Sequence, residues 1–196
     1  ENDKVQAILF GWQGGIEGGS AIADILCGDV NPSGKMVDTV ATTYDCYPCK
    51  DDFWESFWYC DYSDDIYVGY RYFETIPGAD KFVRYPFGFG LSYTKFSFSG
   101  KACLESEGKI VAVVTVKNIG DTAGKEVVQL YYSAPQGKLG KPAKELAAYK
   151  KTKLLAPGES ETVVMSFDIN SMASFDDLGK IQKTAYVLEK GAYTFH

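Results

Sequence analysis

The most regular pattern of hydrophobic and polar positions lies between residue 95 and the C-terminus. Apolar side chains alternate there with polar ones over short segments, and turn signals such as Pro157-Gly158 separate the segments. Short alternating segments without a helical period predict an antiparallel β-sandwich of about 100 residues. We expect its strands at residues 96–104, 109–118, 126–134, 144–154, 160–168 and 184–195.

Residues 1–42 follow a different pattern. Residues 5–10 are a short apolar run, which is typical of a strand covered on both faces. A glycine-rich turn leads into a predicted helix over residues 20–26, whose apolar face consists of Ala21, Ile22, Ile25 and Leu26. Gly28 ends this helix, and residues 35–40 are a predicted returning strand. One such β-α-β unit needs further strands of an α/β sheet to bury its faces.

The stretch between these two parts, residues 43–94, shows neither the period of a strand nor that of a helix. Tyr, Trp, Phe and Asp crowd residues 51–65. Because a buried aromatic side chain contributes about 1.5–3 kcal/mol, we expect this region to pack across a domain interface. The predicted organisation is therefore an α/β piece at 1–42, an aromatic-rich connecting region at 43–94 and a sandwich at 95–196.

Charge and composition exclude several classes of protein. The 196 residues carry a net charge of −6 and have a pI near 4.9. Nucleic-acid binding needs clustered Lys and Arg, and an anionic membrane would repel this surface, so we expect neither partner. No apolar run approaches the roughly 20 residues that cross a bilayer, and no signal peptide is visible. The single histidine is His196, which excludes His-based catalytic and metal sites.

The five cysteines are an odd number, which favours a reducing, cytoplasmic compartment, with a secreted parent protein left open. Cys46 and Cys49 have the spacing of a redox motif or a zinc knuckle. Their flanks differ from the strand and helix of a thioredoxin motif, and zinc would need Cys60 and Cys27 as further ligands. Free structural thiols are favoured, with a local disulfide as the alternative. We expect no metal and no cofactor.

The glycine-rich turn at residues 11–19 differs from nucleotide-binding loops. Gln13 occupies a position where G-x-G-x-x-G requires glycine, and the Gly-Lys-Ser/Thr of a P-loop is absent. A tight turn with a close backbone approach is the favoured interpretation. Glu17 lies in this turn and is interpreted as a structural contact of the helix N-terminus rather than as a catalytic acid.

The acidic aromatic stretch is the best candidate for contact with a sugar. Aromatic faces stack on the apolar face of a pyranose ring, and carboxylates accept its hydroxyl hydrogens. The candidates are Trp54, Trp58, Tyr59 and Asp61. Interface packing is the favoured role of the loop as a whole. Tyr70 and Arg71 are expected at the same interface, where the guanidinium would satisfy carbonyls or a carboxylate.

Three phrases, in a fixed order, resemble family 3 glycoside hydrolases. Residues 14–35 resemble the signature near the end of that family's α/β-sandwich domain. Residues 66–73 and 85–94 resemble its link into a fibronectin-III-like domain, whose strands are resembled by residues 113–118, 123–131, 144–146 and 157–159. The resemblance covers nearly the whole chain. It implies a mixed fold: a partial α/β unit followed by an all-β, immunoglobulin- or fibronectin-III-like antiparallel sandwich.

The resemblance also implies an activity, that of a retaining β-glycosidase similar to β-glucosidases, which cuts terminal non-reducing bonds with two carboxyl groups. In the family the nucleophilic Asp comes from a separate barrel, and the acid/base residue usually lies upstream of the strand that opens this chain. We therefore assign no catalytic residue and expect the chain alone to be inactive, with a bracing role. Its implied partners are the (β/α)8 barrel, the remaining α/β domain and a β-glucoside or oligosaccharide; a homodimer is left open.

Two departures from the family pattern concern the substrate more than the fold. Asp64-Asp65 stand where members often have Glu-Gly, and residues 36–42 replace a common Leu-Pro-containing run. Glucosides are the default expectation, with xylosides and arabinosides open. The apolar run that opens the chain is what a fragment of a longer protein would show. The alternative is a free-standing, non-catalytic module that binds carbohydrate or protein.

Overall fold

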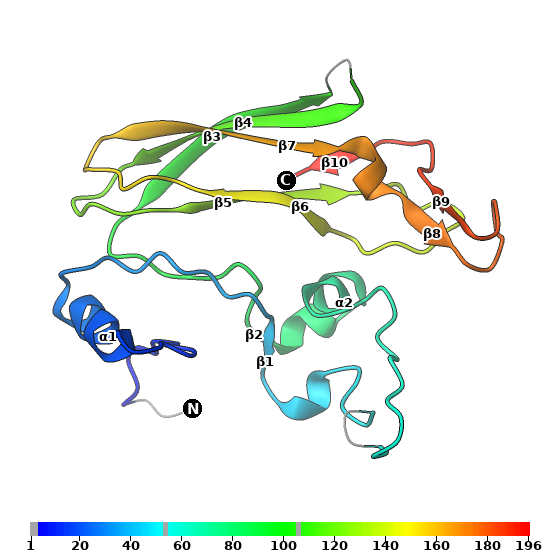
Figure 1. Cartoon of the computed structure of the whole chain (residues 1–196), viewed down its shortest axis with the longest axis horizontal. Coiled ribbons are helices and arrows are strands. Elements are labelled where there is room, and N and C mark those ends of the chain that lie inside the picture. The colour runs from blue at the N-terminus through cyan, green and yellow to red at the C-terminus, as the bar shows by residue number, and fades with distance from the viewer. Residues whose placement is uncertain (1–3, 53–54, 105–106) are drawn as a thin grey trace.

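The C-terminal half of the chain is a two-layer β-sandwich. The computed structural model describes residues 4–52, 55–104 and 107–196. One sheet has the order β3-β4-β7, with bounds Phe96–Leu104, Lys109–Asn118 and Ser160–Asp168 (Figure 1). The facing sheet has the order β10-β5-β6, with bounds Thr194–Phe195, Val127–Ser133 and Glu145–Lys151. All pairs are antiparallel, which confirms the predicted fold class of this half.

The sandwich core follows from the alternation along the strands. In β4 and β7, Ala112 lies opposite Met165, and both are buried. Val128 and Leu130 of β5 face them from the other sheet, and Leu155 closes the cluster with an exposed fraction of 0%. Because a buried Val, Leu or Met side chain contributes roughly 1.5–3 kcal/mol when it leaves water, this cluster stabilises the packing of the two sheets.

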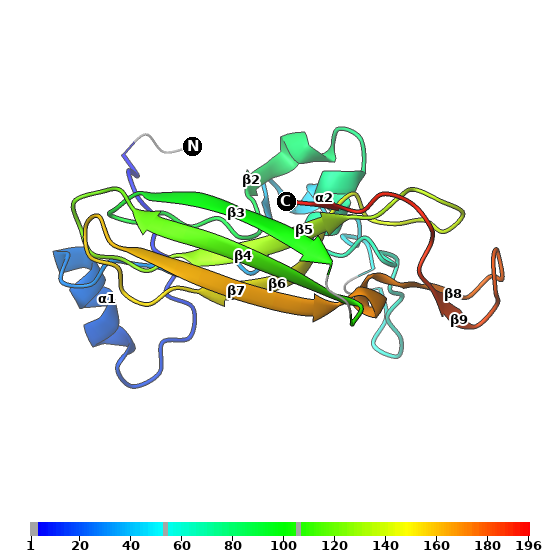
Figure 2. The same cartoon turned by 90° about the horizontal axis from the view of Figure 1, so that it is seen from above.

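The predicted strand at residues 184–195 is wrong in its extent. The chain instead forms β9 (Ala185–Val187) and the short β10, and β9 pairs with β8 (Ser174–Asp176), which the pattern did not predict. The 3-10 helix η3 (Ile169–Met172) leads into β8. Figures 1 and 2 show the β8–β9 hairpin beyond the end of the sheets. The alternation is broken at Lys190-Gly191, so one continuous strand cannot form.

Two carboxylates fix the loops at this end of the sandwich. Asp176, with an exposed fraction of 0%, accepts backbone hydrogen bonds from residues 179–182 at 2.6–2.9 Å. Burial works to raise the pKa of Asp176, but the four N–H donors outweigh it and lower the pKa. Glu189 pairs with the buried Lys141, and this ion pair, with two further backbone donors, lowers the pKa of Glu189.

The N-terminal part keeps the predicted helix, but one predicted strand is absent and the other is shortened. Helix α1 spans Gly18–Cys27, and Gly28 ends it in the left-handed conformation. Residues 5–10 form no strand, and Val5 and Ile8 are more than half exposed. The predicted strand at 35–40 is reduced to β1, Val40–Ala41. Strands of a parallel sheet need neighbours on both edges, and none of the described residues supplies them here.

The connecting region has more structure than its sequence pattern predicts. It contains the 3-10 helices η1 (Tyr44–Cys46) and η2 (Ala79–Phe82), helix α2 (Tyr70–Thr75) and strand β2 (Val83–Tyr85), which pairs with β1. Its small core consists of Ala41, Phe73 and Ala79. Elements this short carry too few turns for a period to be visible. Figure 1 places α1 and α2 on the side of the β5–β6 sheet.

Candidate functional site: the interface and the aromatic loop

Tyr70, at the start of α2, is the central contact between the connecting region and the sandwich. Its ring stacks on Phe87 with a centroid distance of 4.7 Å and meets Tyr131 of β5 edge-on at 6.0 Å. Its hydroxyl accepts a hydrogen bond of 2.7 Å from the backbone N–H of Leu146 in β6. Tyr131 and Tyr132 point to opposite faces of β5, so Tyr131 is available to the interface while Tyr132 enters the core.

Charged side chains surround this aromatic contact. Arg71 lies 3.3 Å from the Glu145 carboxylate, which also accepts a 2.9 Å hydrogen bond from the Tyr132 hydroxyl. Lys144 pairs with Glu74 at 2.6 Å, and its ammonium lies 5.0 Å from the centre of the Tyr131 ring. Burial, with the nearby charges, raises the pKa of Tyr131 to about 12. Burial also raises the pKa of Tyr132, so Tyr131 and Tyr132 both stay neutral donors at physiological pH.

A second set of contacts joins the turn after α1 to the sandwich. The Asn31 amide donates to the Ala123 carbonyl at 3.0 Å, and its oxygen accepts from the Tyr93 N–H at 2.9 Å. Lys35 pairs with Glu126 at 2.7 Å, with side-chain exposed fractions of 16% and 12%. Lys35 also donates to the Gly90 carbonyl at 3.1 Å. Asn31 and Lys35 were not predicted as interface residues, although both lie within the phrase that carries the family resemblance.

The glycine-rich turn before α1 fits the structural interpretation. A Cβ on Gly14 would lie 2.8 Å from the Gly18 backbone, so the chain needs glycine there. Glu17 is the N-cap residue of α1, but its exposed side chain makes no capping hydrogen bond. Neither residue contacts a second carboxyl group in the contacts that the structure gives. The turn therefore offers geometry for close packing, and the role of Glu17 stays a prediction.

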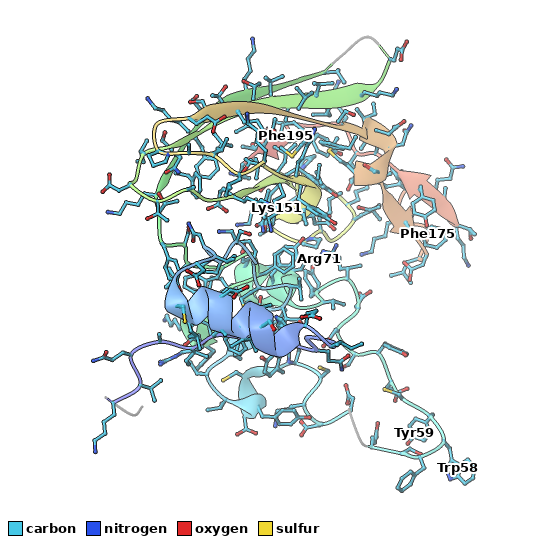
Figure 3. The ribbon with its side chains drawn as sticks, turned by 60° about the vertical axis from the view of Figure 1, so that its left-hand side comes forward. Trp58, Tyr59, Arg71, Lys151, Phe175 and Phe195 are labelled. Carbon is cyan, nitrogen blue, oxygen red and sulfur yellow. The ribbon has the colours of Figure 1, made fainter. Side chains whose placement is uncertain are left out.

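The aromatic loop, which lies within residues 51–65 and carries Trp58, Tyr59 and Asp61, projects away from the sandwich and from the N-terminal part. Trp58 is 94% exposed and Tyr59 57%, and Figure 3 shows the two side chains at an outer extremity of the molecule. Asp61 is exposed as well, while Trp54 lies outside the described residues. The expected burial of this loop is thus absent at its tip, within this chain. Figure 3 shows Trp58 and Tyr59 well apart from Arg71, so these predicted residues form two separate groups.

The base of the aromatic loop is ordered by polar contacts. The Ser63 hydroxyl donates to the Asp52 carboxylate, and the Trp58 N–H donates to the Ser56 hydroxyl at 3.1 Å. Both hydrogen bonds are exposed contacts within the loop. An exposed tryptophan, an exposed tyrosine and a carboxylate on one loop are the groups that can stack on a sugar ring and accept from its hydroxyls.

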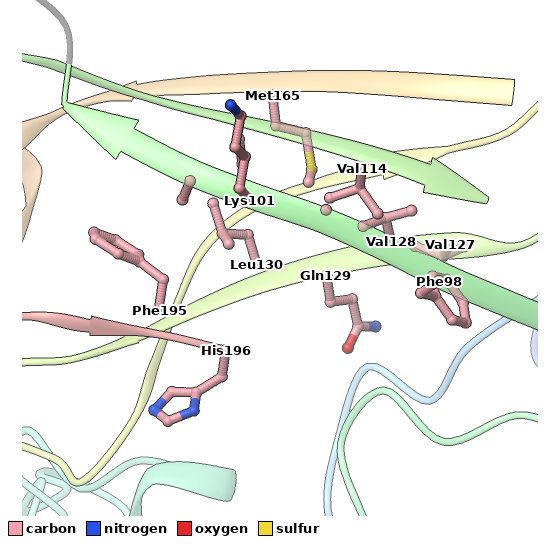
Figure 4. A pocket seen from close by; sticks show the side chains of 13 residues that line it. Phe98, Lys101, Val114, Val127, Val128, Gln129, Leu130, Met165, Phe195 and His196 are labelled. Atoms are coloured by element: carbon pink, nitrogen blue, oxygen red, sulfur yellow. The ribbon is translucent and has the colours of Figure 1, made fainter.

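A cavity lies elsewhere, at the open edge between β3 and β5. It has a volume of about 390 Å³ and is lined mainly by core side chains such as Val114, Val128 and Met165 (Figure 4). Lys101, Gln129 and His196 are its polar members, and no carboxyl side chain is among its described lining residues. Over the described part of the chain, no group of three metal-ligating side chains occurs, and no helix is both long and apolar enough to cross a membrane.

Comparisons with known proteins agree with this arrangement. Residues 1–93 match the glycosyl hydrolase family 3 C-terminal domain, and residues 126–196 match a fibronectin type III-like domain. β-Glucosidase A of Butyrivibrio fibrisolvens is 55% identical over 210 aligned positions, which cover 100% of this chain and 25% of that protein. A β-glucosidase of Ruminococcus albus is 45% identical, with coverage of 97% and 20%.

Solved structures give the same result. A β-glucosidase from Paenibacillus barengoltzii superposes with a TM-score of 0.86 at 49% identity, covering 91% of this chain and 20% of that one. β-Glucosidase 3B from Thermotoga neapolitana, solved with α-D-glucose, gives a TM-score of 0.83 at 39% identity, with coverage of 93% and 25%. The chain thus spans a quarter or less of the length of these relatives.

Proposed function

Because the chain belongs to glycoside hydrolase family 3, we propose that it is the C-terminal portion of a retaining β-glycosidase. The proposed reaction is hydrolysis of terminal non-reducing β-glucosidic bonds, since the relatives are named β-glucosidases. Retention needs one carboxyl group as nucleophile and one as acid/base. Neither role is assigned to a residue of this chain, whose proposed role is to brace the domains that carry them.

One observation supports the bracing role. The N-terminal and connecting regions make specific contacts with the sandwich, and they also have an apolar surface that faces solvent. Asn31, Lys35 and Tyr70 attach the N-terminal and connecting regions to the sandwich. Residues 5–10 and Leu26 of α1, which is 71% exposed, leave an apolar surface uncovered. Exposed apolar surface of this kind marks a contact site. We propose that the remaining α/β domain covers it in the complete enzyme.

The aromatic loop is the proposed point of contact with the substrate. Trp58 and Tyr59 would stack on a sugar ring, and Asp61 would accept its hydroxyl hydrogens. Their exposure supports this role, because both aromatic rings are open to solvent and can be reached by a sugar ring. Trp54 belongs to the same proposal from its sequence position alone.

The experiment is hydrolysis of a chromogenic β-glucoside by this chain, by the complementary polypeptide of a family member, and by the two combined. We expect no turnover from the chain alone and activity on combination. Trp58→Ala in the complete enzyme should raise KM with little change in kcat, whereas Tyr186→Ala, an exposed aromatic on the β8–β9 hairpin, should change neither. Turnover by the chain alone would show that a carboxyl group described above as structural is catalytic.

The second candidate is a non-catalytic module that binds carbohydrate or protein, favoured by the same exposed aromatic loop. A soluble β-glucan oligosaccharide is the probe for it. Saturable binding to the isolated chain, lost in Trp58→Ala, together with failure to complement activity, would favour the module over the enzyme fragment.

A further inference from the structure

Strand β5 has an open edge over part of its length. Strand β10 pairs with β5 at Thr194 and Phe195, and His196 then exchanges two backbone hydrogen bonds with Tyr131, of 2.9 and 3.0 Å. Over residues 127–130, no strand in the described part of the chain pairs with β5 on this side, although β6 pairs with it on the other. An open strand edge is a template on which a further strand can be laid.

The next backbone groups along this edge belong to Gln129. In an antiparallel ladder, successive residues direct their N–H and C=O groups to opposite neighbours. Glu126 accepts from the Thr152 N–H on the β6 side at 2.9 Å, whereas Tyr131 bonds on the β10 side. Gln129 therefore faces the β10 side, as Tyr131 does. Val127 faces the same way, but its N–H donates to the Glu126 carboxylate at 2.7 Å, which caps the edge.

The cavity of about 390 Å³ lies along this open edge. Figure 4 shows it between Phe195 at one end and Phe98 at the other, with Leu130 and Val128 of β5 along it. Close-packed protein interiors leave few voids larger than a water molecule. A space of this size between two sheets is therefore room for apolar side chains that the described residues do not supply. Phe98, at its far end, is 53% exposed.

The register of β10 specifies which side chains of a continuing strand would enter the cavity. Phe195 packs into the core, while His196 is exposed. Because successive side chains of a strand face opposite sides, the first residue beyond this pair would face the cavity opposite Leu130. The third would face it opposite Val128. The second would lie opposite Gln129, with its N–H and C=O directed at that residue.

We propose that this edge and its cavity are an acceptor site for a further length of β-strand. The occupant is an extended segment of a longer polypeptide that runs on from β10, antiparallel to β5. Its first and third residues are apolar and fill the cavity beside Leu130 and Val128. Its second residue exchanges backbone hydrogen bonds with Gln129 and can be polar.

Continuity with the β10–β5 pairing favours this occupant over a separate peptide or a second copy of the chain. The hydrogen bonds between His196 and Tyr131 already hold the backbone in line with the open edge. A tethered segment therefore meets the edge at a high effective concentration. A separate molecule would lose its translational and rotational freedom on binding. The proposal does not rest on the glycosidase assignment, so loss of one leaves the other standing.

The test appends four residues to the full chain after His196, in two orders of equal composition. Val-Thr-Val-Thr places valine at the first and third positions, towards the cavity, whereas Thr-Val-Thr-Val places it on the opposite side. We expect the first extension to raise Tm by about 5 °C or more, because two valines are buried. The second extension is the matched control and should leave Tm unchanged. Equal Tm values for the two extensions overturn the proposal.

Hydrogen exchange at the Gln129 amide reports on the new ladder directly. Protection of this amide should rise about tenfold or more in the Val-Thr-Val-Thr extension and stay unchanged in Thr-Val-Thr-Val. A third extension, Val-Pro-Val-Thr, keeps both valines but has no N–H to donate to the Gln129 carbonyl. It should lose most of the gain in Tm. Unchanged protection of Gln129 in the Val-Thr-Val-Thr extension overturns the proposed register.

Sedimentation of the unmodified chain separates this occupant from a second copy. We expect exchange at Gln129 to be independent of protein concentration, because the open edge waits for a segment in cis. Protection of Gln129 that rises with concentration, together with a dimer in sedimentation, assigns the edge to a second copy and overturns the proposal.

Discussion

The sandwich and the N-terminal segment are held in place by different kinds of interaction. In the sandwich, β4 pairs with β3 and β7 along its length, and its apolar side chains meet those of the facing sheet. In the segment before residue 40, the apolar run stays exposed, and individual polar contacts such as Lys35–Glu126 fix the chain in place. The two sheets of the sandwich bury each other's apolar faces. The apolar run of the N-terminal segment has no such facing surface among the described residues, so its position depends on individual polar contacts.

Leu155→Ala tests the core of the sandwich and should have the largest effect on stability. Leu155 has an exposed fraction of 0%, so truncation removes buried methyl groups and leaves a cavity. We expect a loss of about 2–5 kcal/mol in the free energy of unfolding, measured by urea denaturation. Leu178→Ala is the matched control, because Leu178 is 71% exposed and should change stability by less than about 0.5 kcal/mol. Equal losses in the two variants would remove the distinction between core and hairpin.

Lys35→Met tests the attachment of the N-terminal segment. The Lys35–Glu126 pair is nearly buried, so removal of the ammonium leaves Glu126 with an unpaired charge. We expect a loss of about 2 kcal/mol, below the roughly 3–5 kcal/mol of fully buried pairs, because both side chains keep some exposure. The Met36 amide, which donates to Phe89 O at 2.7 Å, is the reporter in hydrogen exchange. Its protection should fall about thirtyfold.

The control for this variant is an ion pair of similar length in solvent. Lys153 lies 2.8 Å from Glu159, with side-chain exposed fractions of 59% and 38%. Lys153→Met should leave protection of Met36 and overall stability nearly unchanged, since solvent screens exposed pairs. Equal effects of the two lysine substitutions would show that burial of the pair is irrelevant to the attachment.

Asp176→Asn should have the smallest effect of these variants. It tests how the stability of the β8–β9 hairpin depends on pH, in contrast to that of the sheets. Because the folded pKa of Asp176 is lowered, its stabilising effect is complete above the unfolded pKa and is lost as pH falls through the folded value. Thermal stability of the unmodified chain should therefore decline below about pH 4, and the Asn variant should decline less steeply there. Asp177→Asn, an exposed neighbour, should follow the unmodified chain; a flattened profile in that variant would assign the effect to general charge.

The sequence pattern predicted the sandwich well because alternation and turn residues act locally. Strands β3, β4 and β7 have the predicted bounds, and β5 and β6 lie inside the predicted ranges. The β8–β9 hairpin was missed because it depends on Asp176, whose carboxylate gathers four N–H groups of the following loop. Such an arrangement produces no periodic pattern of apolar and polar residues in the sequence.

The candidate site could be predicted only in part. Tyr70 and Arg71 lie at an interface with the sandwich, but the family-like phrase around Asn31 and Lys35 gave no sign that these side chains cross to residues 123–126. Long-range partners cannot be read from local spacing. The role of Trp58, Tyr59 and Asp61 stays a prediction, because it depends on what covers these residues in a longer polypeptide. The two boundaries between the three predicted parts also stay predictions.

The hydrogen bond from Asn31 to Ala123 has a consequence for biosynthesis. Its two residues lie 92 positions apart, so the acceptor leaves the ribosome long after the donor. At about 5–20 residues per second, the delay is roughly 5–20 s. Throughout that interval the segment around α1 has apolar side chains and no sandwich to dock on. The turn after α1 can therefore reach its docked position only after β4 has been synthesised and the chain has passed residue 123.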